Sequence, residues 1–234
     1  MRLRPWLIGL AVLSWLPLSG CAALNEWLEG TVGEEEKKDG PTPEEELANQ
    51  QTALAGSDPA KRKEAIGKLV GLKRDDANSV VIALIDDRDP AVASEVLSQL
   101  QTMTGFPEKT EDERQLDPEG YDQQLKFKQQ VLTEGLPKLA ATVQQAAPEA
   151  RYGALIVLYN LTKPPVVPDN ARDTIKTQAA DALGALAVAE ELPRDARLLA
   201  IETLVAVDAG PQVGNLVPLL QSPDAILRER VALA

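Results

Sequence analysis

Histidine is missing from the 234-residue chain, and cysteine occurs once, at Cys21. Aromatic residues make up only 3% of the sequence. Without histidine the chain has neither a His-dependent catalytic triad nor the commonest general base, and the usual zinc sites are also removed. A single cysteine leaves no thiol pair for an internal disulfide. Chemistry by carboxylate, serine or lysine side chains remains open.

Positive charge is scarce as well. The chain has 24 Lys and Arg against 36 Asp and Glu, a formal net charge of −12, which argues against nucleic acid as a partner. The acidity is concentrated in two stretches. Residues 22–56 carry nine acids and two lysines, a net of −7, and residues 102–124 carry seven acids and two basic residues, a net of −5. The rest of the chain is nearly balanced.

The N-terminal apolar run is too short to cross a bilayer. It occupies residues 7–18, whereas a spanning helix needs about 20 apolar residues. Arg2 and Arg4 precede it, and a positive start followed by a short apolar run is typical of a secretory signal peptide. The alternative is an uncleaved helix with a buried cysteine.

The run ends in Leu18-Ser19-Gly20-Cys21, which resembles the lipobox of bacterial lipoproteins. The resemblance implies that residues 1–20 are a signal peptide, cleaved before Cys21, and that the Cys21 sulfur carries a diacylglycerol. The new amino group is usually acylated too, and two or more chains anchor a protein stably. We therefore expect a lipid anchor in a bacterial membrane. Ala22 after the cysteine implies the outer membrane, facing the periplasm, if the source is Gram-negative.

A linker and a folded domain are expected after the anchor. Residues 21–41 hold the cysteine and an acidic, glycine-containing stretch, which indicates a flexible tether. Thr42-Pro43-Glu44-Glu45 matches a capping box with proline at the first helical position, so we predict a helix over residues 43–55. From there to residue 234 the pattern is helix, short turn, helix, with proline at most of the helix starts.

An internal repeat runs through this domain with the pattern Arg-x-x-(Ala/Val)-apolar-x-x-Leu. It begins at Arg62, Arg151, Arg197 and Arg228, and a partial copy begins at Ala93, where alanine replaces the arginine. The starts are separated by 31, 58, 46 and 31 residues, which fits a unit of 31 with extra residues in the two middle gaps. A period of this size indicates a solenoid of stacked helix pairs. The last copy stops one residue before its expected leucine, so one interpretation is that the chain is a fragment.

The Asp-Pro helix starts and the Arg-x-x-Ala core resemble HEAT-type repeats over residues 57–234. The fold expected from this resemblance is all-α, a HEAT-like α-solenoid of paired helices, with armadillo-like repeats as an alternative. HEAT units often carry a ladder of aspartate and arginine between neighbours. The resemblance implies that role for Asp58, Asp89, Asp195 and Asp224 together with Arg62, Arg151, Arg197 and Arg228, although Ala93 breaks the series.

The first wide gap contains an acidic insert, about residues 105–122, followed by a predicted helix over residues 123–133. Long loops in compact folds are often functional. The acids of this insert indicate one of two roles, contact with a basic partner or a solvated insertion. They are Glu108, Glu111, Asp112, Glu113 and Asp117. They lack the spaced ligands and central glycine of a calcium loop. The second gap holds a proline-rich turn and a predicted helix over residues 170–189.

These features favour a membrane-anchored, non-enzymatic scaffold that binds a protein partner of unknown identity on the surface of its solenoid. No catalytic residue, metal site or cofactor is expected beyond the covalent lipid at Cys21. The competing interpretation is a ligand carrier or lyase, since some HEAT-like proteins resemble bilin lyases. The missing histidine, the lack of a free thiol and the few aromatics argue against it.

Overall fold

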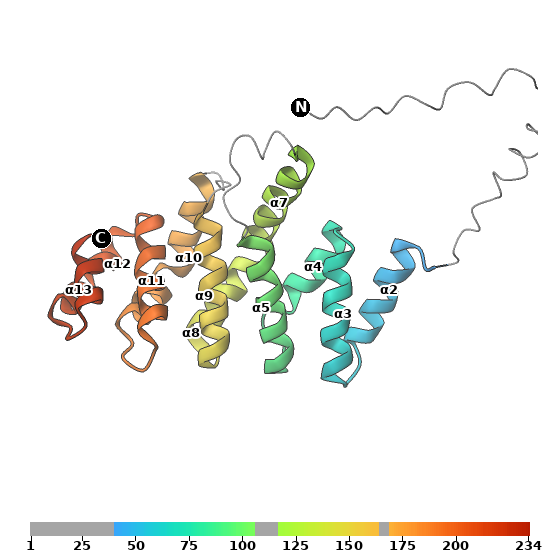
Figure 1. Cartoon of the computed structure of the whole chain (residues 1–234), viewed down its shortest axis with the longest axis horizontal. Helices are drawn as coiled ribbons and strands as arrows, with labels where there is room; N and C mark the ends of the chain where they lie inside the picture. The colour runs from blue at the N-terminus through green and yellow to red at the C-terminus, as the bar shows by residue number, and fades with distance from the viewer. Residues whose placement is uncertain (1–39, 106–116, 164–168) are drawn as a thin grey trace, which may run out of the picture. The chain divides into compact units, whose positions relative to one another are not determined.

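The computed structural model describes residues 40–105, 117–163 and 169–234, and the compact unit that it defines is Thr42–Ala234. Every regular element in these ranges is a helix, and none is a strand (Figure 1). The all-α prediction is therefore confirmed. The helices are α2 (Pro43–Leu54), α3 (Pro59–Gly71), α4 (Asp75–Ala83), α5 (Pro90–Thr104), α7 (Pro118–Gln130), the π-helix η1 (Val131–Gly135), α8 (Leu136–Gln145), α9 (Pro148–Thr162), α10 (Asp169–Val188), α11 (Arg194–Ala206), α12 (Gly210–Gly214), the 3-10 helix η2 (Val217–Gln221) and α13 (Ala225–Ala232).

Local capping explains most of the helix starts. The Thr42 hydroxyl accepts a hydrogen bond from the Glu45 N–H at 3.2 Å, and the Glu45 carboxylate accepts one from the Thr42 N–H at 2.8 Å. This reciprocal pair is the predicted capping box. Proline is the first residue of α3, α5 and α9, because its fixed φ suits that position and its missing N–H has no helical partner there. Pro193 and Pro223 instead lie just before α11 and α13.

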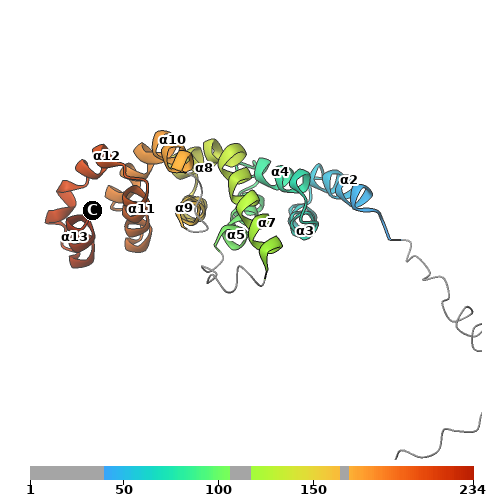
Figure 2. The same ribbon diagram turned by 90° about the horizontal axis from the view of Figure 1, so that it is seen from above.

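The helices form two rows within the Thr42–Ala234 unit. Figure 2 shows α3, α5, α9, α11 and α13 in one row, and α2, α4, α8, α10 and α12 in the other. Consecutive members of the first row pack against each other, and these are the helices that carry the sequence repeat. The buried apolar positions of the repeat are Ala65, Ile66, Leu69, Val96, Leu97, Leu100, Ala154, Leu155, Leu158, Ala200, Ile201, Leu204 and Val231.

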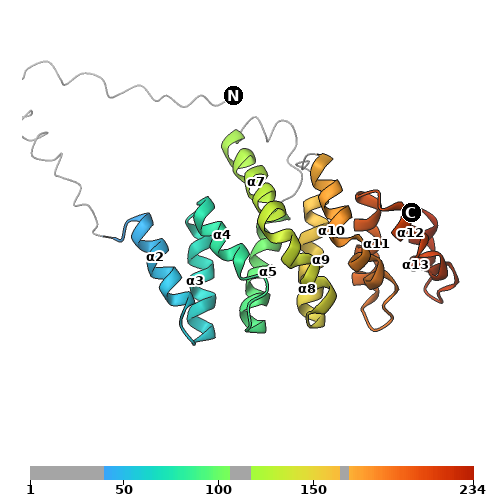
Figure 3. The same cartoon turned by 180° about the vertical axis from the view of Figure 1, so that it is seen from behind.

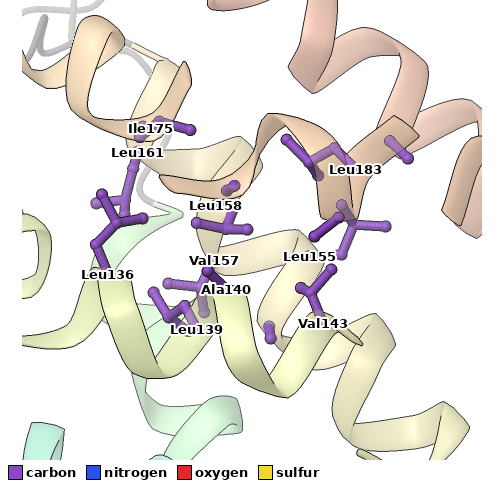
Figure 4. Close-up of a cluster of buried hydrophobic side chains, with 14 of the residues drawn as sticks. Leu136, Leu139, Ala140, Val143, Leu155, Val157, Leu158, Leu161, Ile175 and Leu183 are labelled. Carbon is purple, nitrogen blue, oxygen red and sulfur yellow. The ribbon is translucent and has the colours of Figure 1, made fainter. Parts of the chain in front are cut away.

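One cluster of the core between the rows lies among α8, α9 and α10. Leu139 of α8, Leu158 of α9 and Leu183 of α10 are each 0% exposed, and their side chains gather in the same cluster (Figure 4). Fully burying one such side chain contributes roughly 1.5–3 kcal/mol. Because the cluster draws on three successive helices, each helix needs its neighbours to bury its apolar face.

The segment that interrupts the repeat is longer and more continuous than the sequence predicted. We expected a helix over residues 123–133, but α7 begins at Pro118 and continues through the π-helical turn η1 into α8 (Figure 3). Gly135 ends this turn beside α4. A Cβ at that position would lie 3.1 Å from Ile85 Cδ1 and 3.2 Å from Ile82 Cγ2, so glycine allows the close approach of the two segments.

Candidate functional site

A groove of about 920 Å³ lies among the turn between α3 and α4, the C-terminal half of α5, and α7. Its volume is within the range of pockets that bind ligands in proteins. Val70, Met103 and Phe127 supply its apolar surface, and Phe127 is 5% exposed. The groove is therefore built where the inserted segment α7 meets the first repeats.

The turn between α3 and α4 is fixed by its backbone. Lys73 follows the C-cap residue Leu72 and has a φ of 53°, in the left-handed region that ends many helices. Arg74 is then extended and is the N-cap residue of α4. This sharp turn places both cations in the groove wall.

Arg74 is held by two carboxylates. Its Nη2 atom lies 2.8 Å from Asp76 Oδ2, and its Nη1 atom lies 2.6 Å from Glu44 Oε1 at the start of α2. The hydrogen bonds from Arg74 hold the pKa of the Asp76 carboxyl and that of the Glu44 carboxyl below their usual values. Arg74 thereby links α2 to the groove.

The charges that line the groove balance each other. The cations are Lys73, Arg74 and Lys126, and the anions are Asp75, Asp76 and Asp117, three of each. Lys126 of α7 forms an ion pair with Asp75 of α4 across the groove wall. Arg74 is thus paired with Asp76 and Lys126 with Asp75, and cations and anions are equal in number among the described residues that line the groove.

Two amide side chains of the groove wall each have one buried atom with no hydrogen-bond partner among the described residues. Asn78 of α4 is 7% exposed, and its Oδ1 atom accepts no hydrogen bond in the described part of the chain. On α7 the Nε2 atom of Gln124 is buried and donates none to any described residue. An unsatisfied buried polar group costs about 1–3 kcal/mol. In the described part of the chain, these two buried atoms are therefore left unsatisfied by the fold.

The first repeat arginine has a buried ion pair that the sequence did not predict. Arg62 pairs with Asp87, and each side chain is 7% exposed. Its Nε atom also donates to the Leu54 carbonyl at the end of α2, at 3.0 Å. Burial raises the pKa of the Asp87 carboxyl, but hydrogen bonds from the Asp89 N–H and from Arg62, together with the charge of Arg62, outweigh it and hold that pKa below its usual value.

The other repeat arginines contact the end of the preceding helix. Arg151 donates to the Ala146 carbonyl at 2.7 Å, Arg197 to that of Ala187 at 3.0 Å, and Arg228 to that of Ser222 at 2.7 Å. Cationic donors are favourable there because the last carbonyls of a helix lack helical partners. The repeated arginine thus joins α3, α9, α11 and α13 to the element before each of them.

The predicted aspartates have a local role in the structure. Asp58 accepts from the Ala60 N–H and Asp89 from the Ala91 N–H, each at 2.9 Å, so they are the N-caps of α3 and α5. Asp224 caps α13 in the same way. Between described residues, none of the four ladder aspartates forms an ion pair with a repeat arginine. Asp58, Asp89 and Asp224 therefore cap their own helices, whereas Asp195 lies in the first turn of α11 and accepts from Arg194.

Most of the other predicted site residues lie outside the described residues. These are Leu18, Ser19, Gly20 and Cys21 of the lipobox and Glu108, Glu111, Asp112 and Glu113 of the acidic insert. Asp117 is described: it is the N-cap of α7, accepts from the Gly120 N–H at 3.0 Å, and borders the groove. The groove thus lies next to the insert that the sequence singled out.

Lys128 is a buried residue that sequence reasoning missed. It is 0% exposed, and its Nζ atom donates to the carbonyls of Asn160 and Lys163 at the end of α9, at 3.1 and 3.2 Å. Burial lowers the pKa of Lys128 to about 8. The sequence held a signal, because Lys128 falls at helical spacing with the buried Phe127, Val131 and Leu132. Lys128 therefore fixes α7 to the end of α9.

Other candidate features are few. A second pocket, of about 190 Å³, lies where the start of α9 meets α10 and α11, beside Tyr152 and Leu192. Among the described residues, no group of three or more His, Cys, Asp or Glu side chains is placed to hold a metal ion. None of the described helices combines the length and the apolar character needed to cross a bilayer.

Comparison with known proteins gives structural likenesses only. No family model matches the chain, and a search of curated proteins finds no match. Among solved structures, two engineered proteins of the Northeast Structural Genomics Consortium are similar to it. One is 18% identical with a TM-score of 0.42, and the match covers 80% of this chain and 56% of that protein. The other is 16% identical with a TM-score of 0.44, and the match covers 80% of this chain and 95% of that protein.

Proposed function

We propose that this protein is a membrane-anchored lipoprotein whose helical repeats bind a polypeptide partner through the groove among α3, α4, α5 and α7. The observation that carries the proposal is the groove itself. It lies where α7 departs from the regular stacking, it has an apolar surface, and the Arg74–Asp76 and Lys126–Asp75 ion pairs lie in its wall. Such a surface suits a binding module.

HEAT-like character is part of the proposal. The repeat positions are buried along one row of helices, and each row member that carries the arginine contacts the end of the element before it. Stacks of this kind offer extended surfaces for protein partners. A rigid stack would hold the walls of the groove at a fixed separation.

The anchor is proposed from Leu18-Ser19-Gly20-Cys21. A diacylglycerol on Cys21 would hold the chain on a bacterial membrane, facing the periplasm from the outer membrane in a Gram-negative cell. A flexible linker of about 20 residues has a root-mean-square span of roughly 25 Å. The partner is therefore expected at or near the membrane surface.

Site-specific photo-crosslinking in native envelopes tests the binding function. A photoreactive phenylalanine analogue replaces Gln123, which lines the groove, and in a matched variant it replaces Gln129, which is exposed on the same helix outside the groove. We expect a polypeptide adduct from position 123 and none from position 129. Equal adducts from both positions, or none from either, would contradict the groove as the binding site.

The anchor has its own test. Cys21→Ser should release the protein from the membrane fraction and leave its helical circular dichroism unchanged. A Cys21→Ser protein that stays membrane-bound would show that the lipobox has been misread.

A ligand carrier is the second candidate, because a groove of about 920 Å³ also fits small molecules. Native mass spectrometry of the purified full chain distinguishes a ligand carrier from a protein-binding scaffold. A stoichiometric small molecule on the chain would favour the carrier over the scaffold.

A further inference from the structure

Lys73 is a cation of the groove wall whose side chain has no partner among the described residues. It is exposed and lines the groove, and no described carboxylate lies within ion-pair distance of it. The other two cations of the wall are neutralised, because Arg74 pairs with Asp76 and Lys126 pairs with Asp75. The groove therefore presents one positive charge that lacks a direct counter-charge in the described part of the chain.

The place of Lys73 in the wall is set by its backbone. Its φ of 53° turns the chain at the end of α3, and its N–H donates to the Val70 carbonyl at 3.3 Å. The next residue, Arg74, is the N-cap residue of α4 and is held by its ion pairs. The unpaired lysine is thus attached to a fixed turn, next to an apolar residue of the same groove wall, Val70.

We propose that the polypeptide segment bound in the groove carries an acidic residue beside an apolar one, and that Lys73 forms an ion pair with that acid. This inference rests on the proposed function and names the chemistry of the bound segment. Val70 and Met103 line the groove together with Lys73 and give the apolar residue a surface to contact. A methionine side chain adapts readily to different shapes, so this surface accommodates several apolar residues.

The anions of the groove wall favour an acidic segment over a basic one. Asp75 and Asp76 are already paired with cations, and Asp117 caps α7 by accepting from the Gly120 N–H. A cationic group would have to compete with these contacts to find a carboxylate. An incoming carboxylate reaches the ammonium group of Lys73 without breaking any of them, and a charge-assisted hydrogen bond is stronger than one to a neutral group.

Lack of a partner does not by itself distinguish Lys73. Lys61 of α3 is also exposed and has no ion pair with a described residue, whereas Lys68 on the same helix pairs with Glu64. What Lys73 has in addition is its place in the groove wall, which Lys61 does not line. Lys61 is therefore a matched control for a lysine that carries the same free charge outside the groove.

The test uses the full chain in detergent micelles and a library of short linear peptides. Peptides enriched on the parent chain are labelled, and their affinities are measured by fluorescence anisotropy. We expect the enriched peptides to carry Asp or Glu beside an apolar residue. Lys73→Gln should weaken their binding about threefold to fivefold, because one ion pair at a partly exposed site is lost. Lys73→Arg keeps the charge and should bind like the parent, as should Lys61→Gln.

A change in the peptide completes the test. Replacing its acid by the matching amide should reproduce the loss seen with Lys73→Gln and add little further loss in that variant, because both changes remove the same ion pair. Raising the ionic strength should reduce the difference between the parent and Lys73→Gln, since salt screens an ion pair at an exposed site. Urea unfolding shows whether the variants keep the fold of the parent.

Several results would overturn the inference. They are that no peptide is enriched, that the enriched peptides lack acids, that Lys73→Gln binds them as tightly as the parent, or that Lys61→Gln loses as much affinity as Lys73→Gln. Zero-length carbodiimide crosslinking of the full chain adds one more. A crosslink from Lys73 to a carboxylate of the same chain would show that the protein itself supplies the counter-charge.

Failure of the proposed function is a different outcome. If the position 123 crosslink to a polypeptide forms in native envelopes and is undiminished in Lys73→Gln, the groove binds a partner and only its recognition of an acid is wrong. If position 123 of the parent gives no adduct, the proposed function itself is wrong.

Discussion

Arg62 and Lys128 are two buried cations that hold helix ends together in two different regions of this protein. Arg62, in the first repeat, contacts the carbonyl of Leu54 and is neutralised by Asp87. Lys128, in the inserted segment α7, contacts the carbonyls of Asn160 and Lys163. Among described residues it has no carboxylate within ion-pair distance, and its pKa is lowered to about 8.

The interface around Arg62 recurs along the chain, whereas the interface around Lys128 occurs at α7. Arg62 follows a pattern that recurs at Arg151, Arg197 and Arg228, in which the arginine contacts the preceding element. Lys128 instead joins α7 to a helix that comes later in the chain. Lys128 holds α7 against α9, although burial removes its ammonium group from water. This contact matters for the groove, because α7 forms one of its walls. α7 is thus held by a buried cation with no carboxylate partner among the described residues, whereas the buried Arg62 is neutralised by Asp87.

Removing the charge at Arg62 should have the largest effect. Arg62→Met leaves Asp87 buried without its partner, and breaking a buried ion pair in this way costs about 3 kcal/mol. Urea unfolding at pH 7 measures the loss. Lys68→Met on the same helix breaks an exposed pair with Glu64 and serves as the control, with no measurable change expected.

A double substitution tests whether the unpaired Asp87 carboxylate causes this loss of stability. Arg62→Met with Asp87→Leu removes both charges and should recover most of the stability, because the cost lies in the stranded carboxylate. If the double variant is as unstable as the single one, the hydrogen bond to Leu54 and not the ion pair holds this interface.

Lys128→Met should change how stability depends on pH. The ordinary pKa of lysine, 10.5, is higher than the value of about 8 in the folded chain, so the unfolded chain binds more protons between these values. The penalty of the buried charge is therefore full below pH 8 and fades as the pH rises toward 10.5. Between pH 7 and pH 10 the parent should gain about 2 kcal/mol relative to Lys128→Met.

Urea unfolding of both proteins at the two pH values measures this difference, and Lys126→Met, whose side chain is exposed, is the control. If the parent and Lys128→Met have parallel pH profiles, Lys128 is not desolvated in the folded protein and the contrast with Arg62 disappears.

The smallest effect is expected at a helix cap. Asp89→Ala removes the side-chain acceptor at the start of α5 and should destabilise the protein by about 1 kcal/mol. Asp89→Asn keeps an acceptor at that position and should restore most of the loss. If both variants lose the same stability, the charge of Asp89 matters and the cap does not.

Much of the fold could be predicted because its causes are local. Thr42 and Glu45 cap α2 through residues three apart, and Pro59, Pro90 and Pro148 begin helices because of their own φ. The repeat spacing also identified the row of helices that shares the core. The role of the aspartates needed the structure, because the Asp-Pro pattern at Asp58 and Asp89 is compatible both with a ladder between repeats and with a cap within one helix.

The candidate site could be predicted only in outline. The sequence marked the insert around residues 105–122 as unusual, and the groove borders its end at Asp117. It did not mark Asn78 or Gln124, since nothing local distinguishes them from the amides that find partners. Whether an amide is satisfied depends on which helices meet, and α4 and α7 meet across about fifty residues of sequence.

The sequence by itself determined the helical fold, the caps, the repeat and the resemblance to a lipid-anchored chain, because each depends on residues close together or on a regular spacing. Tertiary structure alone decided that Arg62 pairs with Asp87, that Lys128 reaches the end of α9, and that one buried atom of Asn78 and one of Gln124 have no partner among the described residues. Those features arise where residues far apart in the sequence pack together.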